Sequence, residues 1–190
     1  MSEFLEIRWH GRGGQGAVTA SKILAESAIE NGKFIQAFPE YGPERAGAPV
    51  RSFTRVSSSP IPVHSQVTNP HVVAVLDPTL LEVVDVTEGL AEDGILVVNT
   101  NDAPAALRRK FGIKGRKIFT VPATDIAIKE LKRNIPNTPM IAAVVKVTGI
   151  LDIKNVEKDF EAKYSKKFTP EIIAGNLRAM RAAFDAVKGE

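Results

Sequence analysis

The chain has 190 residues, of which 44% are hydrophobic and 25% are charged, a balance that is typical of a globular protein and argues against disorder. It contains no cysteine, which excludes a disulfide, a thiolate zinc site, a cysteine-bound iron–sulfur cluster and a cysteine nucleophile on this chain. The net charge of +3 is unevenly distributed, because residues 1–102 hold 7 basic and 13 acidic side chains whereas residues 103–190 hold 18 and 9. This asymmetry indicates either solvated lysine-rich helix faces or a charged partner surface.

The N-terminus and the apolar runs bear on the compartment. Residues Met1–Glu6 lack the basic-then-apolar profile of a signal peptide. No apolar run approaches the roughly 20 residues that cross a bilayer. We therefore expect a cytoplasmic protein without a membrane span.

The first half of the chain reads as a strand–turn–helix unit followed by two short strands. The expected elements are a strand at Phe4–Trp9, a glycine-rich turn at Gly11–Gly16, a helix over Ala17–Asn31, and strands at Phe34–Phe38 and Val50–Ser57. The last of these alternates in side-chain character, which favours a strand with one wetter face that runs antiparallel to its neighbours.

The second half alternates apolar runs with helical patterns. Strands are expected at His71–Asp77, Ile95–Asn99 and Lys117–Val121, and helices at Ala103–Lys110, Thr124–Arg133, Met140–Val147 and Thr169–Val187. Asp77 is expected to cap a further helix that has Pro78 at its first position. The helix Met140–Val147 is apolar nearly all round, which is typical of a helix buried in a core or in an interface.

This order of elements predicts the fold class. Alternating strands and helices at this spacing are typical of an α/β protein in which helices cover both faces of a parallel sheet. We therefore expect residues 1–190 to form a single three-layer, doubly wound, Rossmann-like domain. Its sheet should be mostly parallel, with at least one antiparallel strand.

The glycine-rich turn is the first candidate site. Gly11, Gly13 and Gly16 match the G-x-G-x-x-G fingerprint, in which the glycines permit a tight turn, a close backbone approach to an anion, and close helix–strand packing. Free N–H groups at a helix start favour phosphate, and Arg12 adds a charge. Residues Gln36–Pro39, however, stand where a dinucleotide site needs an acidic residue. A turn that serves only packing therefore stays open as the alternative.

The second candidate site is the segment Pro39–Pro49, which three prolines and two glycines make stiff. It carries polar side chains able to grip a ligand or a partner, among them Glu40. The two candidate segments together comprise Gly11, Arg12, Gly13, Gly14, Gln15, Gly16, Tyr41, Gly42, Pro43, Glu44 and Arg45. The alternative for the segment Pro39–Pro49 is a rigid surface loop that binds nothing and has an internal charge pair between Glu44 and Arg45.

Other polar residues give weaker signals. No nucleophile elbow, paired-carboxylate or histidine metal spacing is found, so we expect no catalytic residue and no metal site on this chain. His10 is expected to be a hydrogen-bonded structural histidine. Residues Lys163–Phe168 mix basic and aromatic side chains, but a solvated helix end beside two partly buried rings explains them better than a nucleic-acid site.

Taken together, the two loops resemble those of one known family. The matching residues are Gly11–Val18, Ala20, Leu24, Pro39–Val50 and, before an apolar helix, Asn137–Met140. Over nearly the whole chain the sequence resembles the gamma subunit of pyruvate:ferredoxin oxidoreductase, within the 2-oxoacid:acceptor oxidoreductases. The pyruvate/2-ketoisovalerate branch is the most similar. One departure is Ala46, where many relatives have arginine, so one cationic contact is lost.

The resemblance implies a function that one chain cannot perform alone. In the family, 2-oxoacids such as pyruvate are oxidatively decarboxylated on thiamine diphosphate, electrons pass through [4Fe–4S] clusters to ferredoxin, and coenzyme A takes the acyl group to give acetyl-CoA. The thiamine diphosphate and the clusters are expected on partner subunits, called alpha, beta and delta. The segments Gly11–Gly16 and Tyr41–Arg45 are expected to face the coenzyme A region, and direct contact is left open. The isolated chain is expected to be inactive.

Two alternatives belong to other classes of protein. The first is a free-standing nucleotide- or dinucleotide-binding protein that uses the turn Gly11–Gly16. The second is a nucleic-acid module built on the basic half, which is disfavoured because solvated lysine-rich helix faces explain the charge better.

Overall fold

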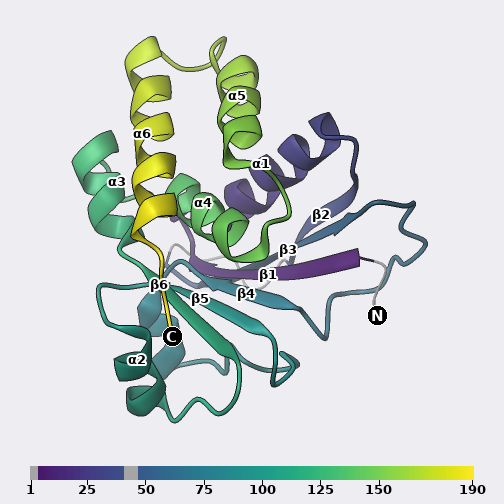
Figure 1. The fold of residues 1–190 in the computed structure, drawn as a ribbon, viewed down its shortest axis with the longest axis vertical. Helices are drawn as coiled ribbons and strands as arrows, with labels where there is room; N and C mark the ends of the chain where they lie inside the picture. The colour runs from purple at the N-terminus through teal and green to yellow at the C-terminus, as the bar shows by residue number, and fades with distance from the viewer. Residues whose placement is uncertain (1–3, 41–46) are drawn as a thin grey trace.

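A seven-stranded β-sheet runs through the centre of the molecule (Figure 1). The computed structural model describes residues 4–40 and 47–190. The strands are β1 (Phe4–Arg12), β2 (Phe34–Glu40), β3 (Pro49–Ser57), β4 (Val72–Val75), β5 (Ile95–Asn99), β6 (Lys117–Val121) and β7 (Lys188–Gly189). They lie side by side in the order β2-β3-β1-β4-β5-β6-β7.

The four central strands β1, β4, β5 and β6 run parallel to one another. β3 pairs antiparallel with both β1 and β2, and β7 pairs antiparallel with β6. The expected parallel sheet with antiparallel strands is therefore confirmed. The strands of the apolar runs are buried on both faces, as β4 illustrates, since all four of its residues are buried.

Helices cover both faces of the sheet, which confirms the three-layer α/β class. On one face lie α1 (Ala17–Glu30), α3 (Ala123–Leu131), α4 (Asn137–Thr148), α5 (Ile153–Tyr164) and α6 (Pro170–Ala186), whereas α2 (Pro104–Phe111) and the short 3-10 helix η1 (Pro78–Glu82) lie on the other (Figure 1). The sheet separates two hydrophobic cores, one under each layer of helices. Successive side chains of β4 point to opposite faces, so Val72 and Ala74 pack in the core with α1 and α3–α6, whereas Val73 and Val75 pack in the core with α2 and η1.

The apolar helix α4 belongs to the core of this chain. Its residues from Thr138 to Val145 are all buried, and it packs against α6, α1 and α3. The choice between core and interface that the sequence left open is thus decided in favour of the core. Helix α5 is not among the helices that the sequence patterns predict individually, and the predicted helix after Asp77 is a five-residue 3-10 helix.

Candidate functional site

The site lies where β1 and β4 end side by side. β1 leads into the glycine-rich turn and α1 on one face of the sheet, whereas β4 leads through Asp77 into η1 on the other face. Leu76 N–H donates to the His10 carbonyl at 2.7 Å, which extends the pairing of the two strands to this edge. In α/β sheets such a divergence opens a crevice at the carboxyl ends of the strands.

The glycines of the turn have separate roles. A Cβ at Gly11 would lie 3.1 Å from the Cβ of Ala17, so Gly11 permits close packing of β1 against α1. Gly14 and Gly16 have φ values of +97° and +83°, which side chains rarely adopt. A Cβ at Gly16 would also lie 3.0 Å from Nδ2 of Asn137, at the start of α4. Gly16 therefore serves the contact between α1 and α4 rather than the predicted contact with the strand.

Much of the turn is hydrogen-bonded from within the chain. The Arg12 N–H donates to Oε1 of Gln15 at 2.7 Å, and the Gly13 N–H donates to the Ala48 carbonyl at 3.1 Å. In the described part of the chain, α1 has no side-chain cap, so the N–H groups of its first turn, from Ala17 to Thr19, find no acceptor there. These helix-start groups are the donors that remain open to an anion.

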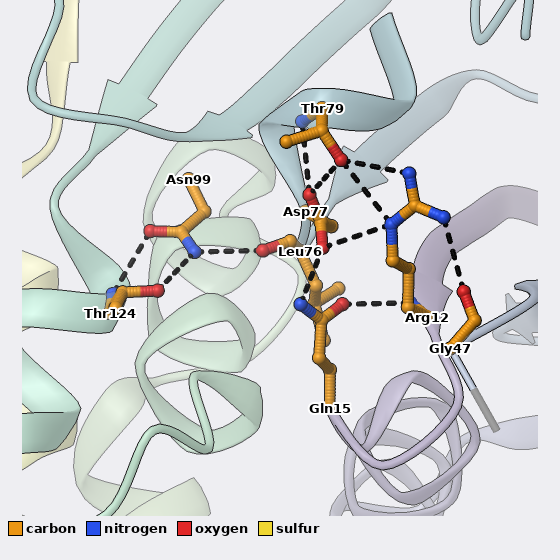
Figure 2. Close-up of polar contacts among 8 residues, drawn as sticks. All are labelled: Arg12, Gln15, Gly47, Leu76, Asp77, Thr79, Asn99 and Thr124. Atoms are coloured by element: carbon orange, nitrogen blue, oxygen red, sulfur yellow. Dashed lines mark hydrogen bonds and ion pairs between the residues drawn. The ribbon is translucent and has the colours of Figure 1, made fainter. Parts of the chain in front are cut away.

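Figure 2 shows a polar network that joins the ends of β1 and β4. Nε2 of Gln15 donates to Oδ2 of Asp77 at 2.7 Å, and the Arg12 guanidinium lies 3.4 Å from the same oxygen. Arg12 also donates to Thr79 Oγ1 at 2.9 Å and to the Gly47 carbonyl at 3.1 Å. The cation expected to meet a ligand is therefore already bound to groups of this chain.

Asp77 is held ionised in this network. Burial would raise the pKa of its carboxyl, but hydrogen bonds from Thr79 and Gln15 and the charge of Arg12 outweigh burial and lower the pKa below its usual value. Asp77 also accepts from the Thr79 N–H at 3.0 Å and so caps η1, as the sequence predicted. Its role at the mouth of the crevice was not foreseen, because Arg12 and Gln15 are more than 60 residues away in sequence.

A second hydrogen-bond network, centred on Asn99, joins the ends of the neighbouring strands β4 and β5. Asn99, the last residue of β5, donates to the Leu76 carbonyl and to Thr124 Oγ1, both at 2.8 Å, and accepts from the Thr124 N–H at 3.0 Å (Figure 2). Asn99 is 3% exposed, and both polar atoms of its side chain are used in these bonds. We assign it a structural role, since it fixes the ends of β4 and β5 against the start of α3.

His10 is buried on β1, on the face opposite Trp9. Burial, together with the nearby charges of Arg8 and Arg51, lowers its pKa to about 3, so the ring is neutral. Its Nε2 finds no hydrogen-bond partner within the described residues. The sequence predicts a hydrogen-bonded structural histidine; the structure buries His10, but it shows no hydrogen bond at Nε2.

The second candidate segment is described only at its ends. Tyr41, Gly42, Pro43, Glu44 and Arg45 lie outside the described residues, and so does Ala46. On one side, Glu40 ends β2 and its carboxylate pairs with Arg51 of β3 at 2.6 Å. On the other, Gly47 and Ala48 accept the hydrogen bonds from Arg12 and Gly13. The C-terminal end of this segment is therefore attached directly to the glycine-rich turn.

The arrangement does not fit a dinucleotide in the usual way. Glu40 ends β2 as an acidic residue would in a dinucleotide site, but the antiparallel strand β3 lies between β2 and β1. Glu40 is moreover paired with Arg51. The carboxylate of Asp77 faces the crevice and would repel a pyrophosphate, whereas the open N–H groups at the start of α1 and the exposed Gly14 do fit one phosphate at the outer edge of the turn.

Residues 4–40 and 47–190 show neither a metal-binding cluster nor a membrane-spanning helix. No group of three or more histidine, aspartate or glutamate side chains in these segments could hold a metal ion. Within the same segments, no helix has the length and the apolar content required to cross a membrane.

Comparison with known proteins identifies the family. Residues 6–186 match the family described as pyruvate ferredoxin/flavodoxin oxidoreductase. The chain is 54% identical to pyruvate synthase subunit PorC of Thermotoga maritima over 186 residues, which covers 98% of this chain and 96% of that one. It is 49% identical to the pyruvate/ketoisovalerate oxidoreductases common subunit gamma of Pyrococcus abyssi over 181 residues, 95% of this chain and 96% of the relative.

A solved structure agrees with these relatives. The crystal structure of pyruvate oxidoreductase subunit PORC from Thermotoga maritima superimposes with a TM-score of 0.87 at 49% identity, covering 100% of this chain and 99% of that one. The resemblance to gamma subunits that the two loops carry is thus confirmed. The chain belongs to the pyruvate ferredoxin/flavodoxin oxidoreductase family.

Proposed function

We propose that this chain is the gamma subunit of a multi-subunit pyruvate (2-oxoacid):ferredoxin oxidoreductase. The complex would decarboxylate pyruvate oxidatively to acetyl-CoA and pass the electrons to ferredoxin. The observation that carries the proposal is the 54% identity to a pyruvate synthase subunit over 98% of this chain. As part of the proposal, residues 1–190 act as one domain in the cytoplasm, and alpha, beta and delta subunits are the partners.

The division of labour within the complex follows from the side chains of this chain. Thiamine diphosphate would supply the carbanion chemistry, and [4Fe–4S] clusters would carry the electrons. The clusters need cysteine ligands, and this chain has no cysteine. For thiamine diphosphate, the sequence lacks the Gly-Asp-Gly signature of a thiamine site. We therefore assign both groups to partner subunits and no catalytic residue to this chain.

For coenzyme A we propose a contact at the outer edge of the glycine-rich turn. The open N–H groups from Ala17 to Thr19 and the positive end of α1 favour a phosphate there. The segment Tyr41–Arg45 would complete the contact from the side of Gly47, which is bound to Arg12. No proton transfer or bond-making step is assigned to these residues, whose role in the proposal is to bind and orient.

The proposal is tested with the complex purified from its source, with and without this chain. The full complex should reduce ferredoxin when pyruvate and coenzyme A are both present, and the complex depleted of this chain should not. The isolated chain should show no pyruvate oxidation. Full activity of the depleted complex, or isolation of the native chain as a lone monomer, would contradict the proposal.

A titration separates this proposal from a free-standing nucleotide-binding protein. NADH, ADP and coenzyme A are added in turn to the isolated chain and to the complex. Binding of coenzyme A that is weakened by Gly13→Val, with unchanged circular dichroism, supports the contact at the turn. Tight NADH binding without coenzyme A binding would favour the free-standing nucleotide-binding protein. The position of β3 between β1 and β2 does not suit a dinucleotide site of that kind.

A further inference from the structure

A groove on the helical face of the molecule begins at Thr19, the last residue of the proposed coenzyme A contact, and its other lining residues are not used in the function proposed above. It has a volume of about 590 Å³ and is lined by residues of α1, α3, α5 and α6 and by the start of α4. These helices stand together on one side of the sheet, with the connection between α5 and α6 at their far end (Figure 1). The groove borders the glycine-rich turn, because Thr19 of α1 and Asn137, the neighbour of Gly16, are among its lining residues.

Large apolar side chains form the groove. Phe160, Tyr164 and Phe168 are four residues apart and stack in a row, with ring centroids 4.8 and 5.8 Å apart. Phe168 is 43% exposed, and Ile172, in the first turn of α6, is 39% exposed. Two neighbouring large apolar side chains that remain exposed beside a hollow are typical of a surface that a partner covers.

Two polar side chains that line the groove, Thr138 and Asn176, are hydrogen-bonded within the chain. Thr138 Oγ1 donates to Asn176 Oδ1 at 2.9 Å, and Asn176 Nδ2 donates to the Ile172 carbonyl at 2.8 Å. The wall is also closely packed, because a Cβ at Gly175 would lie 2.9 Å from the Glu130 carbonyl of α3. The floor thus offers apolar surface rather than hydrogen bonds, which favours an apolar insert over a polar small ligand.

The rim of the groove is basic. Lys129 lies in the last turn of α3, and Lys132 and Arg133 follow the helix. Glu130 pairs with Arg178 at 2.8 Å and with Lys129 at 3.9 Å. Within the described part of the chain, Lys132 and Arg133 form no ion pair. Glu171, next to Ile172, is the second acidic residue of the lining, so four basic side chains stand against two acidic ones. The excess positive charge lies at Lys132 and Arg133, and acidic side chains of a partner would complement it there.

We propose that the groove docks an amphipathic segment of a partner subunit of the same oxidoreductase. Its apolar side chains pack between Phe168 and Ile172, and its acidic side chains lie against Lys132 and Arg133. The apolar contacts supply the affinity, and the charges fix the orientation. This inference rests on the proposed function, since it takes the partner from that complex.

Cross-linking within the intact complex tests the partner. Benzoylphenylalanine placed at position 172 should, on irradiation, join one partner subunit at a segment with apolar residues at helical spacing and flanking aspartate or glutamate. The same probe at position 83, where Val83 is 62% exposed beside η1, is the matched control and should not reach that segment. A link to a second copy of this chain, to a basic segment, or to no chain overturns the proposal.

Binding of variants gives the second measurement. Ile172→Asp, and separately Lys132→Glu with Arg133→Glu, should each weaken retention of this chain in the complex by about tenfold or more, whereas Val83→Asp should not. If Ile172→Asp lowers the melting temperature of the isolated chain, its weaker retention could reflect poor folding. The variant with Lys132→Glu and Arg133→Glu changes only exposed side chains, so it then decides the test. Wild-type assembly with undiminished retention of both variants overturns the docking site and leaves the proposed function intact. Failure of the wild-type chain to assemble overturns both.

Discussion

The side-chain amide of Gln15 joins the ends of two strands by donating to Asp77 at 2.7 Å while it accepts from the Arg12 N–H at 2.7 Å (Figure 2). The glycine-rich turn is therefore closed by a side chain of its own. A ligand phosphate that used the Arg12 N–H would have to displace Gln15, whereas one bound at the first turn of α1 would not. The second position costs fewer hydrogen bonds and is the one that we favour.

Replacing Gln15 by leucine should destabilise the protein. The change removes both hydrogen bonds of the amide, one of them to an ionised carboxylate, and we expect the free energy of unfolding to fall by about 1–3 kcal/mol. Denaturant unfolding of the isolated chain measures the change. Gln66→Leu is the matched control, because Gln66 is exposed and makes no hydrogen bond among the described residues. Equal stability of the two variants would mean that the bridge contributes nothing.

Gly16 and Gly14 allow the effects of backbone strain and of crowding to be separated. Both have positive φ, but a Cβ at Gly14 meets nothing within 4 Å, whereas one at Gly16 lies 3.0 Å from Asn137. We expect Gly14→Ala to cost about 1 kcal/mol of stability, and Gly16→Ala to cost roughly 1–2 kcal/mol more. Combining Gly16→Ala with Asn137→Ala should recover part of the additional loss. If the second substitution recovers none of it, the side-chain amide of Asn137 is not the obstacle.

The strands and the two layers of helices could be predicted because they depend on local patterns. The buried run that becomes β4 and the cap at Asp77 both follow from neighbours in sequence. The partners of Gln15 and Gly16 could not be predicted, because Asp77 and Asn137 approach them only after the sheet and α4 have assembled. The same holds for Glu40, since no sequence pattern specifies that β3 lies between β2 and β1.

His10 should make the stability of the protein depend on pH. Burial first, and then the charges of Arg8 and Arg51, lower its pKa in the folded chain to about 3. In the unfolded chain the pKa of histidine is about 6.5. The folded pKa is the lower one, so the stabilisation is fully present above pH 6.5 and is lost as the pH falls toward 3. Between pH 7 and pH 5 the loss is about 2 kcal/mol.

Denaturant unfolding at several pH values tests this effect. His10→Phe cannot titrate, so the difference in free energy of unfolding between the wild type and this variant should change by about 2 kcal/mol from pH 7 to pH 5. His10→Gln keeps a polar group at the position but cannot titrate either. Its free energy of unfolding should therefore differ from that of the wild type by the same change of about 2 kcal/mol between pH 7 and pH 5. Parallel pH profiles for the wild type and both variants would contradict a buried neutral His10.

Tyr164, in the aromatic row of the groove, should ionise only at strongly alkaline pH. Burial first, and then the charge and the hydrogen bond of Glu26, raise its pKa to about 12. The chain has two tyrosines, so in Tyr41→Phe the phenolate absorbance reports Tyr164 alone, with an expected midpoint near 12. Adding Glu26→Gln should lower the midpoint only part of the way, because burial remains. Since the folded pKa lies above the unfolded value of about 10, stability should fall as the pH rises from 10 toward 12. A midpoint at the ordinary value in Tyr41→Phe would contradict a Tyr164 packed between Phe160 and Phe168.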